Sequence, residues 1–162
     1  MIHPYLPKIL TREGLISKAR SWKLEMASVV FTNGCFDILH YGHVEYLYQA
    51  SLLGDYLIIG LNSQDSVHRL KGPHRPIQDE QTRCAVIAAL GFVDAVSVFS
   101  EDSPEELIRA ISPDVLVKGG DWAVSKIAGA EWVIAHGGRV TTIPYLEGYS
   151  TTAIEAKIKQ QS

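Results

Sequence analysis

The sequence is poor in cysteine, has no long apolar run and carries no excess of positive charge. Two of its 162 residues are cysteine, Cys35 and Cys84, which is too few for a disulfide framework, so a reducing cytoplasm is the expected compartment. No apolar stretch approaches the roughly 20 residues that cross a bilayer, and the start lacks the features of a signal peptide. A formal net charge of −3 gives no bulk attraction to nucleic acid or to an anionic membrane. We therefore expect neither as a partner.

The chain has the composition of one ordinary globular domain. Apolar residues make up 46% and charged residues 20%, and 162 residues are enough to bury a core. We find no internal repeat and no interdomain linker. The prediction is a single domain over residues 1–162, in which residues 1–26 form an N-terminal extension that packs on the rest.

Apolar runs alternate with helical patterns along the whole chain. Strands are predicted at 29–31, 55–61, 95–99, 114–117 and 140–143. Helices are predicted at 11–22, from about 42 to 54, from 79 or 82 to 90, from 103–106 to just before 113, at about 126–135, and from 147–152 onward. Residues 62–70 are polar, with a helical turn as one interpretation, and 71–76 form a loop. Unbroken apolar strands between helices predict an α/β protein, a Rossmann-like open parallel five-stranded sheet with helices on both faces.

Polar motifs follow four of these strands. They are 33–43, 62–75, 118–121 and 147–152. Ligands of open parallel sheets bind at the carboxyl ends of the strands. We therefore expect these segments, distant in sequence, to line one cleft.

The turn after the first strand carries two histidines, His40 and His43, with Gly42 between them. A helix begins there, and a helix N-terminus suits phosphate. A zinc pair is a second interpretation, but no matching cysteine or histidine cluster completes such a site. Surface histidines beside a turn are the third. Gly42 allows a ligand to approach the backbone closely, which favours a phosphate-handling site.

Several motifs resemble one enzyme family. Residues 34–43 resemble the signature of the cytidylyltransferase-like nucleotidyltransferases, with 40–43 as their His-x-Gly-His motif, and 147–152 resemble their second signature. Within that superfamily, 31–40, 71–76, 114–122 and 149–152 are similar to the heptose-1-phosphate adenylyltransferase branch, the stand-alone or C-terminal half of ADP-heptose synthase. The resemblance covers about residues 27–160 in the same order.

The resemblance implies the HIGH-type nucleotidyltransferase fold and a reaction. AMP would pass from ATP to D-glycero-D-manno-heptose 1-phosphate, giving ADP-heptose and pyrophosphate for lipopolysaccharide or another surface polysaccharide. The work would be positioning and charge stabilisation, with Mg²⁺ carried by the nucleotide and no metal ligand from the protein. The partners would be small molecules, with a homodimer as an option. We expect no sugar-kinase domain, so another protein would supply the sugar 1-phosphate.

The resemblance also implies roles for individual residues. The catalytic set would be His40, His43 and Lys71. The nucleotide-binding set would be Thr32, Asn33, Gly34, Cys35, Phe36, Gly42, Arg75, Arg83, Lys118, Gly120, Asp121, Ser150, Thr151 and Thr152. Asp37 and Asn62 would contact the second substrate. Thr32, Asn33, Gly34 and Phe36 would shape the floor of the site, and Gly42 would leave room for the nucleotide.

Some of these residues have a plainer alternative. Asp37 is either a metal ligand or an acceptor for backbone N–H groups, and a tight turn favours the acceptor. Arg83 either reaches the triphosphate or is an exposed first-turn residue. Lys71 and Arg75 form a lid over the phosphates or are solvated surface charges.

Two departures from the family pattern bear on the assignment. Cys35 stands where many members have threonine, so any contact with a ligand there comes from the backbone N–H. The side chains of Cys35 and Cys84 are both expected to be packing residues. Residues 144–146 read Pro-Tyr-Leu where related cytidylyltransferases carry arginine, which argues against the glycerol-phosphate branch. The base stays open between ATP, GTP and CTP. Alternatives are a sibling enzyme (GTP with heptose 1-phosphate, cytidylyl transfer to glycerol 3-phosphate, or adenylyl transfer to pantetheine phosphate) and a non-catalytic nucleotide-binding module.

Overall fold

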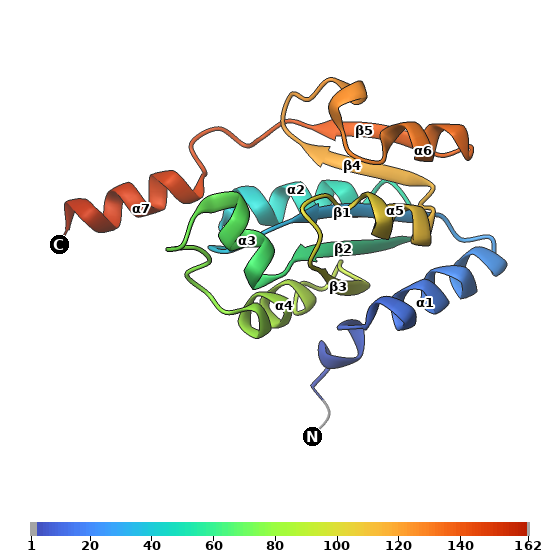
Figure 1. The fold of residues 1–162 in the computed structure, drawn as a ribbon, viewed down its shortest axis with the longest axis horizontal. Helices are drawn as coiled ribbons and strands as arrows, with labels where there is room; N and C mark the ends of the chain where they lie inside the picture. The colour runs from blue at the N-terminus through green and yellow to red at the C-terminus, as the bar shows by residue number, and fades with distance from the viewer. Residues whose placement is uncertain (1–2, 162) are drawn as a thin grey trace.

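The computed structural model describes residues 3–161, in which five parallel strands lie between two layers of helices (Figure 1). The strands are β1 (Val29–Gly34), β2 (Tyr56–Asn62), β3 (Ala95–Phe99), β4 (Val115–Gly119) and β5 (Arg139–Ile143). The helices are α1 (Arg12–Leu24), α2 (Tyr41–Ser51), α3 (Gln64–Lys71), α4 (Glu80–Ala88), α5 (Glu105–Ile111), α6 (Ala130–Ala135) and α7 (Thr151–Gln160). Two short 3₁₀ turns, η1 (Leu6–Lys8) and η2 (Val124–Lys126), complete the set. The predicted fold class is confirmed.

The strand order is β3-β2-β1-β4-β5, so the direction of winding reverses between β1 and β4. β1 pairs with β2 along its whole length, from Val29–Tyr56 to Gly34–Leu61. Among the described residues it pairs with β4 at only two positions, Val30–Val115 and Phe31–Leu116. The two strands therefore separate toward their carboxyl ends. Such a reversal point is where open parallel sheets bind their ligands.

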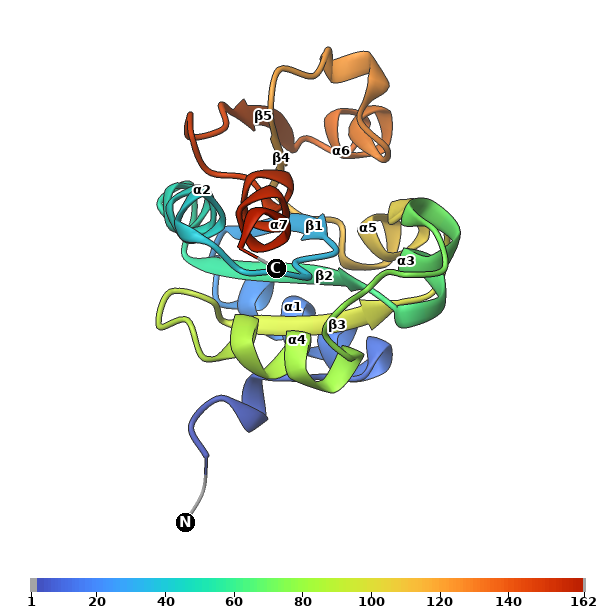
Figure 2. The ribbon, with the colours of Figure 1, turned by 90° about the vertical axis from the view of Figure 1, so that its left-hand side faces the viewer.

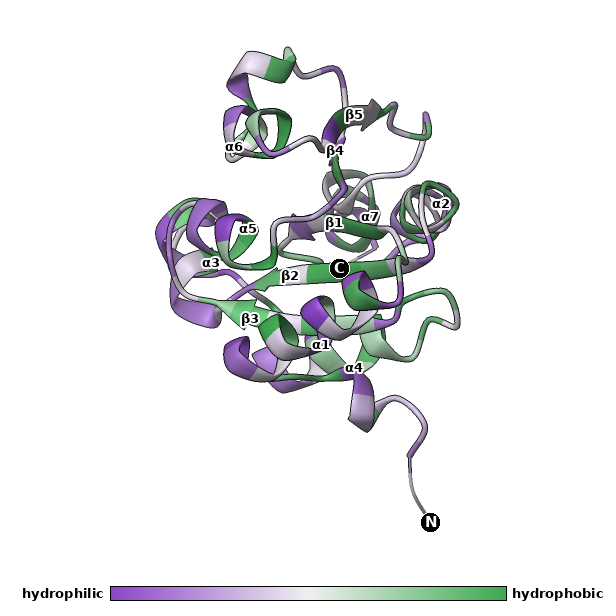
Figure 3. Cartoon of the chain, turned by 90° about the vertical axis from the view of Figure 1, so that its right-hand side faces the viewer, coloured by the Kyte–Doolittle hydropathy of each residue, from purple (hydrophilic) through white to green (hydrophobic). Residues whose placement is uncertain are grey.

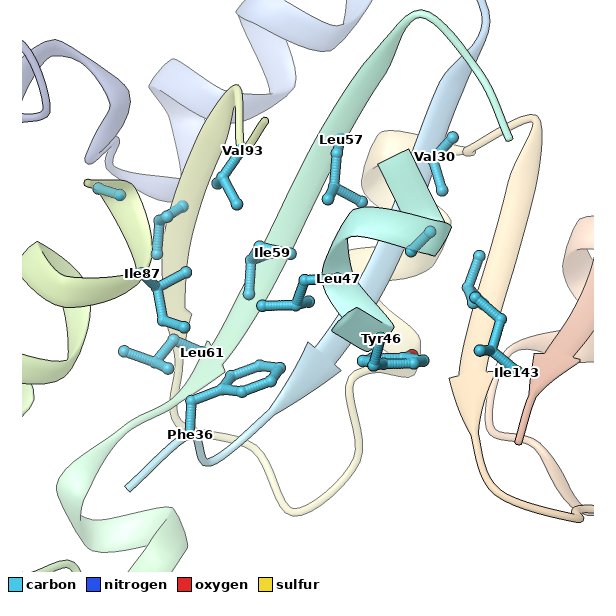
Figure 4. Close-up of a cluster of buried hydrophobic side chains, with 14 of the residues drawn as sticks. Val30, Phe36, Tyr46, Leu47, Leu57, Ile59, Leu61, Ile87, Val93 and Ile143 are labelled. Carbon is cyan, nitrogen blue, oxygen red and sulfur yellow. The ribbon is translucent and has the colours of Figure 1, made fainter. Parts of the chain in front are cut away.

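Each face of the sheet is covered by its own helices, as the end-on view in Figure 2 shows. On one face α2 and α4 enclose a cluster that includes Leu47, Ile59 and Ile87, drawn in Figure 4. On the other face α1, α5 and α6 pack over the strand residues Phe31 and Ile58. Neighbouring residues of β1 point to opposite faces, so burial on both sides requires the unbroken apolar run. Figure 3 shows how buried and exposed elements differ in hydropathy: β2 in the sheet is mostly apolar, and α3 is mostly hydrophilic.

The sequence predicts a helix cap where a short polar side chain precedes an apolar pattern, and two such caps are present. The Thr11 hydroxyl accepts a hydrogen bond from the Gly14 N–H at 3.1 Å and begins α1. Asp79 accepts from the Thr82 N–H at 2.7 Å and begins α4. The N-terminal segment lies against the sheet edge, where the Leu10 N–H donates to the Val96 carbonyl at 2.9 Å.

Several boundaries differ from the prediction. The helix predicted at 126–135 is the 3₁₀ turn η2 followed by the shorter α6, because Gly129 adopts φ +80° and a Cβ there would lie 2.8 Å from Ile108. The polar stretch after β2 is a full helix, α3, capped by Ser63. α2 ends at Ser51 instead of near 54. α5 begins one residue later than its Ser-Pro signal indicated, at Glu105.

The last helix stands apart from the body of the molecule. In Figure 1, α7 extends beyond the carboxyl edge of the sheet, and none of its described residues is buried.

Within the part of the chain that the structure describes, no helix is long and apolar enough to cross a membrane.

Candidate active site

A cavity of about 390 Å³ lies at the carboxyl end of β1. It joins the β1–α2 turn, the ends of α3 and β4, and the segment that precedes α7, so the polar segments converge as predicted. Its lining residues are Asn33, Gly34, Cys35, Phe36, Asp37, His40, Gly42, His43, Tyr46, Lys71, Lys118, Gly119, Tyr145, Leu146, Tyr149, Ser150 and Thr151. Hereafter we call this space the first cavity.

The two histidines form a stacked pair in the first cavity. Their ring centroids are 3.8 Å apart, and both Nδ1 atoms are buried with no hydrogen-bond partner among the described residues. Burial, together with positive charge on His40 and Lys71, lowers the pKa of His43 to about 4, although the nearby Ile38 backbone opposes the shift. Burial also lowers the pKa of His40. Two neutral imidazoles at pH 7 can each donate one hydrogen bond to a phosphate oxygen.

The turn that holds the histidines is tied down by Asp37, whose side chain is 1% exposed. Its carboxylate accepts hydrogen bonds from the Ile77 N–H at 2.8 and 3.0 Å and from the Gln78 N–H at 2.9 Å, and it pairs with Arg75 at 3.1 Å. These contacts favour the structural interpretation of Asp37 over a metal ligand. The partners are 40 residues away in sequence, so the side chain joins two segments and does not simply close its own turn.

The position of Arg83 contradicts both roles predicted for it, that of a triphosphate ligand and that of an exposed residue in the first helical turn. It is fully buried and does not line the first cavity. Its Nη1 donates to the carbonyls of Cys35 at 2.9 Å and Asn62 at 2.8 Å, while Nε and Nη2 have no partner among the described residues. Arg83 therefore links the carboxyl ends of β1 and β2 and places a buried positive charge behind the β1–α2 turn.

Two glycines of the turn make room for side chains. A Cβ on Gly34 would lie 2.9 Å from the Phe36 ring. A Cβ on Gly42 would lie 3.1 Å from both the His40 ring and Tyr149, so these two residues take the space that we expected the nucleotide to need. Phe36 adopts φ +43°, which brings its ring edge-on to His43 with centroids 5.3 Å apart.

Tyr46 lines the first cavity, and the sequence analysis did not predict it there. It lies three residues after His43, on the same face of α2, and this spacing is the signal that could have identified it. Its hydroxyl is 2.6 Å from the hydroxyl of Thr32, which is fully buried and does not reach the first cavity. Burial raises the pKa of Tyr46, so its hydroxyl stays protonated. Thr32 supports the site through Tyr46 instead of forming its floor.

The start of α7 closes one side of the first cavity. The Ser150 hydroxyl accepts from the Ala153 N–H at 3.1 Å and so acts as the helix cap, while Thr151 lines the space. Thr152 is exposed and lies outside the lining. Tyr149, which we had not predicted, packs edge-on against Tyr41 with centroids 5.1 Å apart.

The remaining predicted residues divide between the first cavity and its surroundings. Lys71 and Lys118 line the first cavity, and burial lowers the pKa of Lys118. Arg75 does not line it and instead pairs with Asp37 and with Glu155 of α7. Gly120 and Asp121 lie outside, because the Tyr145 ring covers Gly120, where a Cβ would lie 2.6 Å from it. Asn62 lies outside the first cavity and lines another of about 340 Å³ at the same edge of the sheet. Of the cysteines, Cys84 is buried as expected and Cys35 is partly exposed.

In residues 3–161, no three or more histidine, cysteine, aspartate and glutamate side chains gather where they could hold a metal ion. Asp37, the carboxylate that lines the first cavity, already has N–H and guanidinium partners. A divalent cation at this site would therefore take its ligands mainly from phosphate oxygens.

The sequence matches one protein family and several curated relatives. Residues 31–157 match the family described as cytidylyltransferase-like. The protein named bifunctional protein HldE from Trichlorobacter lovleyi is 50% identical over 154 residues, which are 95% of this chain and 31% of that protein. The protein of the same name from Pseudomonas fluorescens is 51% identical over 151 residues, 93% of this chain and 32% of that protein. The chain thus spans about a third of the length of these curated relatives.

Solved structures show the same fold. The lipopolysaccharide core biosynthesis protein from Thermoplasma volcanium matches with a TM-score of 0.60 and 31% identity, over 76% of this chain and 99% of that one. Pantoate-beta-alanine ligase from Francisella tularensis matches with a TM-score of 0.61 over 93% of this chain and 76% of that one, and its 14% identity shows the fold alone. Because the family match spans most of the sequence and contains the paired histidines, the chain belongs to the cytidylyltransferase-like family and is a nucleotidyltransferase.

Proposed function

We propose that this nucleotidyltransferase transfers AMP from ATP to D-glycero-D-manno-heptose 1-phosphate, giving ADP-heptose and pyrophosphate for lipopolysaccharide or another surface polysaccharide. The observation that carries the proposal is the stacked His40–His43 pair, whose buried Nδ1 atoms lack partners in residues 3–161. Beside it, Lys71, Lys118 and the start of α7 supply positive charge and N–H donors, the chemistry that a triphosphate needs. The branch motifs and the relatives named HldE support the heptose acceptor.

In this reaction a phosphate oxygen of the sugar 1-phosphate attacks the α-phosphorus of ATP. A new P–O bond forms there, the bond from the α-phosphorus to the bridging oxygen breaks, and its electron pair leaves with pyrophosphate. The protein contributes position and charge, because no covalent enzyme intermediate is required. His40 and His43 donate to phosphate oxygens as negative charge grows, each such donor contributing on the order of 3 kcal/mol.

Mg²⁺ belongs to this proposal as the companion of ATP. Carboxylate and phosphate oxygens are its preferred ligands, and the one carboxylate lining the first cavity, that of Asp37, is already engaged. The cation would therefore arrive on the triphosphate and neutralise part of its charge. The protein would work in the cytoplasm on small molecules, and a homodimer is compatible with this role.

A pyrophosphate-release screen tests the function directly. ATP, GTP and CTP are each paired with heptose 1-phosphate, other sugar 1-phosphates, glycerol 3-phosphate and pantetheine phosphate. We expect turnover with ATP and heptose 1-phosphate. Turnover with CTP and glycerol 3-phosphate alone would overturn the acceptor and the base together. The variant His43→Ala separates enzyme from simple binder, since it should bind ATP but release pyrophosphate far more slowly.

A further inference from the structure

Arg83 is the largest fully buried side chain of residues 3–161, and it carries a charge. Removing a charge from water is costly unless an opposite charge accompanies it. No aspartate or glutamate of the described chain forms an ion pair with Arg83, and the buried carboxylate of Asp37 pairs with Arg75 instead. The fold therefore retains a buried positive charge that its own carboxylates leave uncompensated.

The Arg83 guanidinium lies behind the wall of the first cavity. Its Nη1 donates to the carbonyl of Cys35 at 2.9 Å, and Cys35 and Phe36 both line that cavity. Arg83 itself is not among the lining residues. The peptide group between Cys35 and Phe36 therefore separates the buried charge from the space that receives the ligand.

The peptide group between Cys35 and Phe36 is held in one orientation. It is trans, so its C=O and its N–H point in opposite directions. The C=O points to Arg83, and the Phe36 N–H therefore points away from it. Phe36 adopts φ +43°, a left-handed conformation that a residue with a side chain keeps only where its surroundings hold it. The hydrogen bond from Arg83 to the Cys35 carbonyl is one contact that holds it.

Two physical effects carry the influence of Arg83 into the first cavity. A hydrogen bond accepted by a carbonyl polarises its peptide group, so the N–H on the other side becomes a stronger donor. A charge inside the protein is also screened less by salt than an exposed charge, so it attracts anions over a longer range. Under the proposed function the first cavity receives a triphosphate. Its negative charge is the compensation that the described carboxylates do not give to Arg83.

We propose that Arg83 is a positioning residue for the phosphates of the nucleotide. It acts through the peptide group between Cys35 and Phe36, which it orients and polarises, and it does not touch the ligand. The proposal rests on the proposed function, since it concerns the triphosphate of the same reaction. The unliganded protein bears the cost of the buried charge, and bound phosphates offset it. The affinity that Arg83 contributes therefore grows with the negative charge of the ligand.

Calorimetric titration with ligands of increasing charge tests this role. Arg83→Met should weaken the binding of ATP and of inorganic tripolyphosphate about tenfold, because the attraction between the buried charge and the phosphates is lost. The loss should be smaller for ADP and within about twofold for uncharged adenosine. Arg83→Lys, which keeps the charge, should restore the affinity for ATP to within about threefold of wild type. Equal losses for adenosine and ATP, or an unchanged affinity for tripolyphosphate, would overturn the proposal.

A matched variant separates this role from simple destabilisation of α4. Ile87→Ala, one turn further along that helix, removes a fully buried apolar side chain and should lower the urea unfolding midpoint. It should leave the affinity for ATP within about twofold of wild type, since Ile87 does not contact the turn. If it weakens ATP as much as Arg83→Met does, the positioning role is rejected. Arg83→Gln, which keeps an N–H donor but no charge, replaces Arg83→Met if that variant does not fold.

Tripolyphosphate also separates this proposal from the proposed reaction, because it has neither a base nor an acceptor. Binding of tripolyphosphate that depends on the charge of Arg83, without turnover on any acceptor, supports the positioning role while the proposed function fails. Turnover with heptose 1-phosphate, together with phosphate binding that does not depend on Arg83, supports the function and rejects the role.

Discussion

Two segments supply the phosphate-facing groups of the first cavity, and they are held in very different ways. The β1–α2 turn, residues 33–43, is tied by the buried carboxylate of Asp37 and from behind by the fully buried Arg83. The C-terminal segment, residues 144–160, is attached by the packing of Tyr149 against Tyr41 and by the Arg75–Glu155 ion pair, and no residue of α7 is buried. The turn is therefore held by buried polar contacts, whereas α7 is held by contacts of partly exposed side chains.

The largest effect is expected from removing the anchor of the turn. Asp37→Ala leaves the Ile77 and Gln78 N–H groups without their acceptor and leaves Arg75 paired with Glu155 alone, and breaking a buried pair from one side costs about 3–5 kcal/mol. Urea unfolding of wild type and variant measures this loss. The control is Asp65→Ala on the exposed side of α3, expected to shift stability by less than about 0.5 kcal/mol. Equal shifts in both variants would contradict the anchoring role.

Removing a donor from the turn should reduce turnover while leaving the fold intact. His43→Ala is expected to lower kcat about 10²–10³-fold, because one preorganised donor to the developing charge is lost. Pyrophosphate release measures the rate, and thermal unfolding checks the fold. His136→Ala on the far side of β5, at the end of α6, is the matched control. A kcat loss below about threefold would remove His43 from the catalytic set.

The buried histidine of the turn also predicts a pH dependence of stability. The pKa of His43 is about 4 in the folded protein against 6.5 in the unfolded chain. Between these values the unfolded chain binds a proton that the folded protein does not, so stability falls as pH decreases from 6.5 and levels off below about 4. After allowance for partial exposure, His43 accounts for about 1–2 kcal/mol. Urea unfolding of wild type and His43→Asn from pH 7 to 4 tests this, and parallel curves would refute it.

A smaller effect is expected where the C-terminal segment begins. Ser150→Ala removes the cap of α7, which costs that helix about 1 kcal/mol and should raise the KM for ATP about fivefold. The neighbour Thr152 is exposed and lies outside the first cavity, so Thr152→Ala is the control. Loss of ATP affinity in the Thr152 variant but not in the Ser150 variant would reverse our assignment.

The smallest effect concerns the ion pair that attaches α7 to the loop before α4. Glu155→Gln removes the charge opposite Arg75, but the Glu155 side chain is 32% exposed, and such pairs contribute about 0.2–1 kcal/mol. Global stability should hardly change, because Arg75 keeps Asp37. Amide exchange should increase in α7 alone. Faster exchange in the β1–α2 turn as well would show that the two segments are coupled.

The sequence predicted those helices and strands whose formation depends on residues close together in the chain. β3 lies at its predicted residues, Thr11 begins its helix as expected, and Asp79 is the one of the two predicted starts, Asp79 and Thr82, that begins α4. A cap and an apolar period are local signals. The strand-end motifs predicted the convergence on one cavity because ligands of open parallel sheets bind at the carboxyl ends of the strands. The break between η2 and α6 at Gly129 depends on Ile108, which is distant in sequence, so no local pattern predicted it.

Within the site, residue type was easier to predict than what each side chain contacts. Arg83 is a strong phosphate binder by type, but its helix directs it beneath the turn, onto two carbonyls. Tyr145 and Tyr149 were missed because an irregular segment gives aromatic side chains no period from which to infer a facing direction. Thr32 was expected at the floor, yet the two-residue period of β1 turns it into the core, where it meets Tyr46.

The parting of β1 from β4 after Phe31 has a consequence for how this enzyme can be altered. Beyond that pair, the peptide groups on the facing edges have no partner in the ladder between these strands, so they offer donors and acceptors to whatever enters. A peptide group stays the same whichever side chain is attached to it. Recognition by such groups tolerates sequence drift, and side-chain mutagenesis cannot remove it. Changing that part of the specificity would require moving the strands.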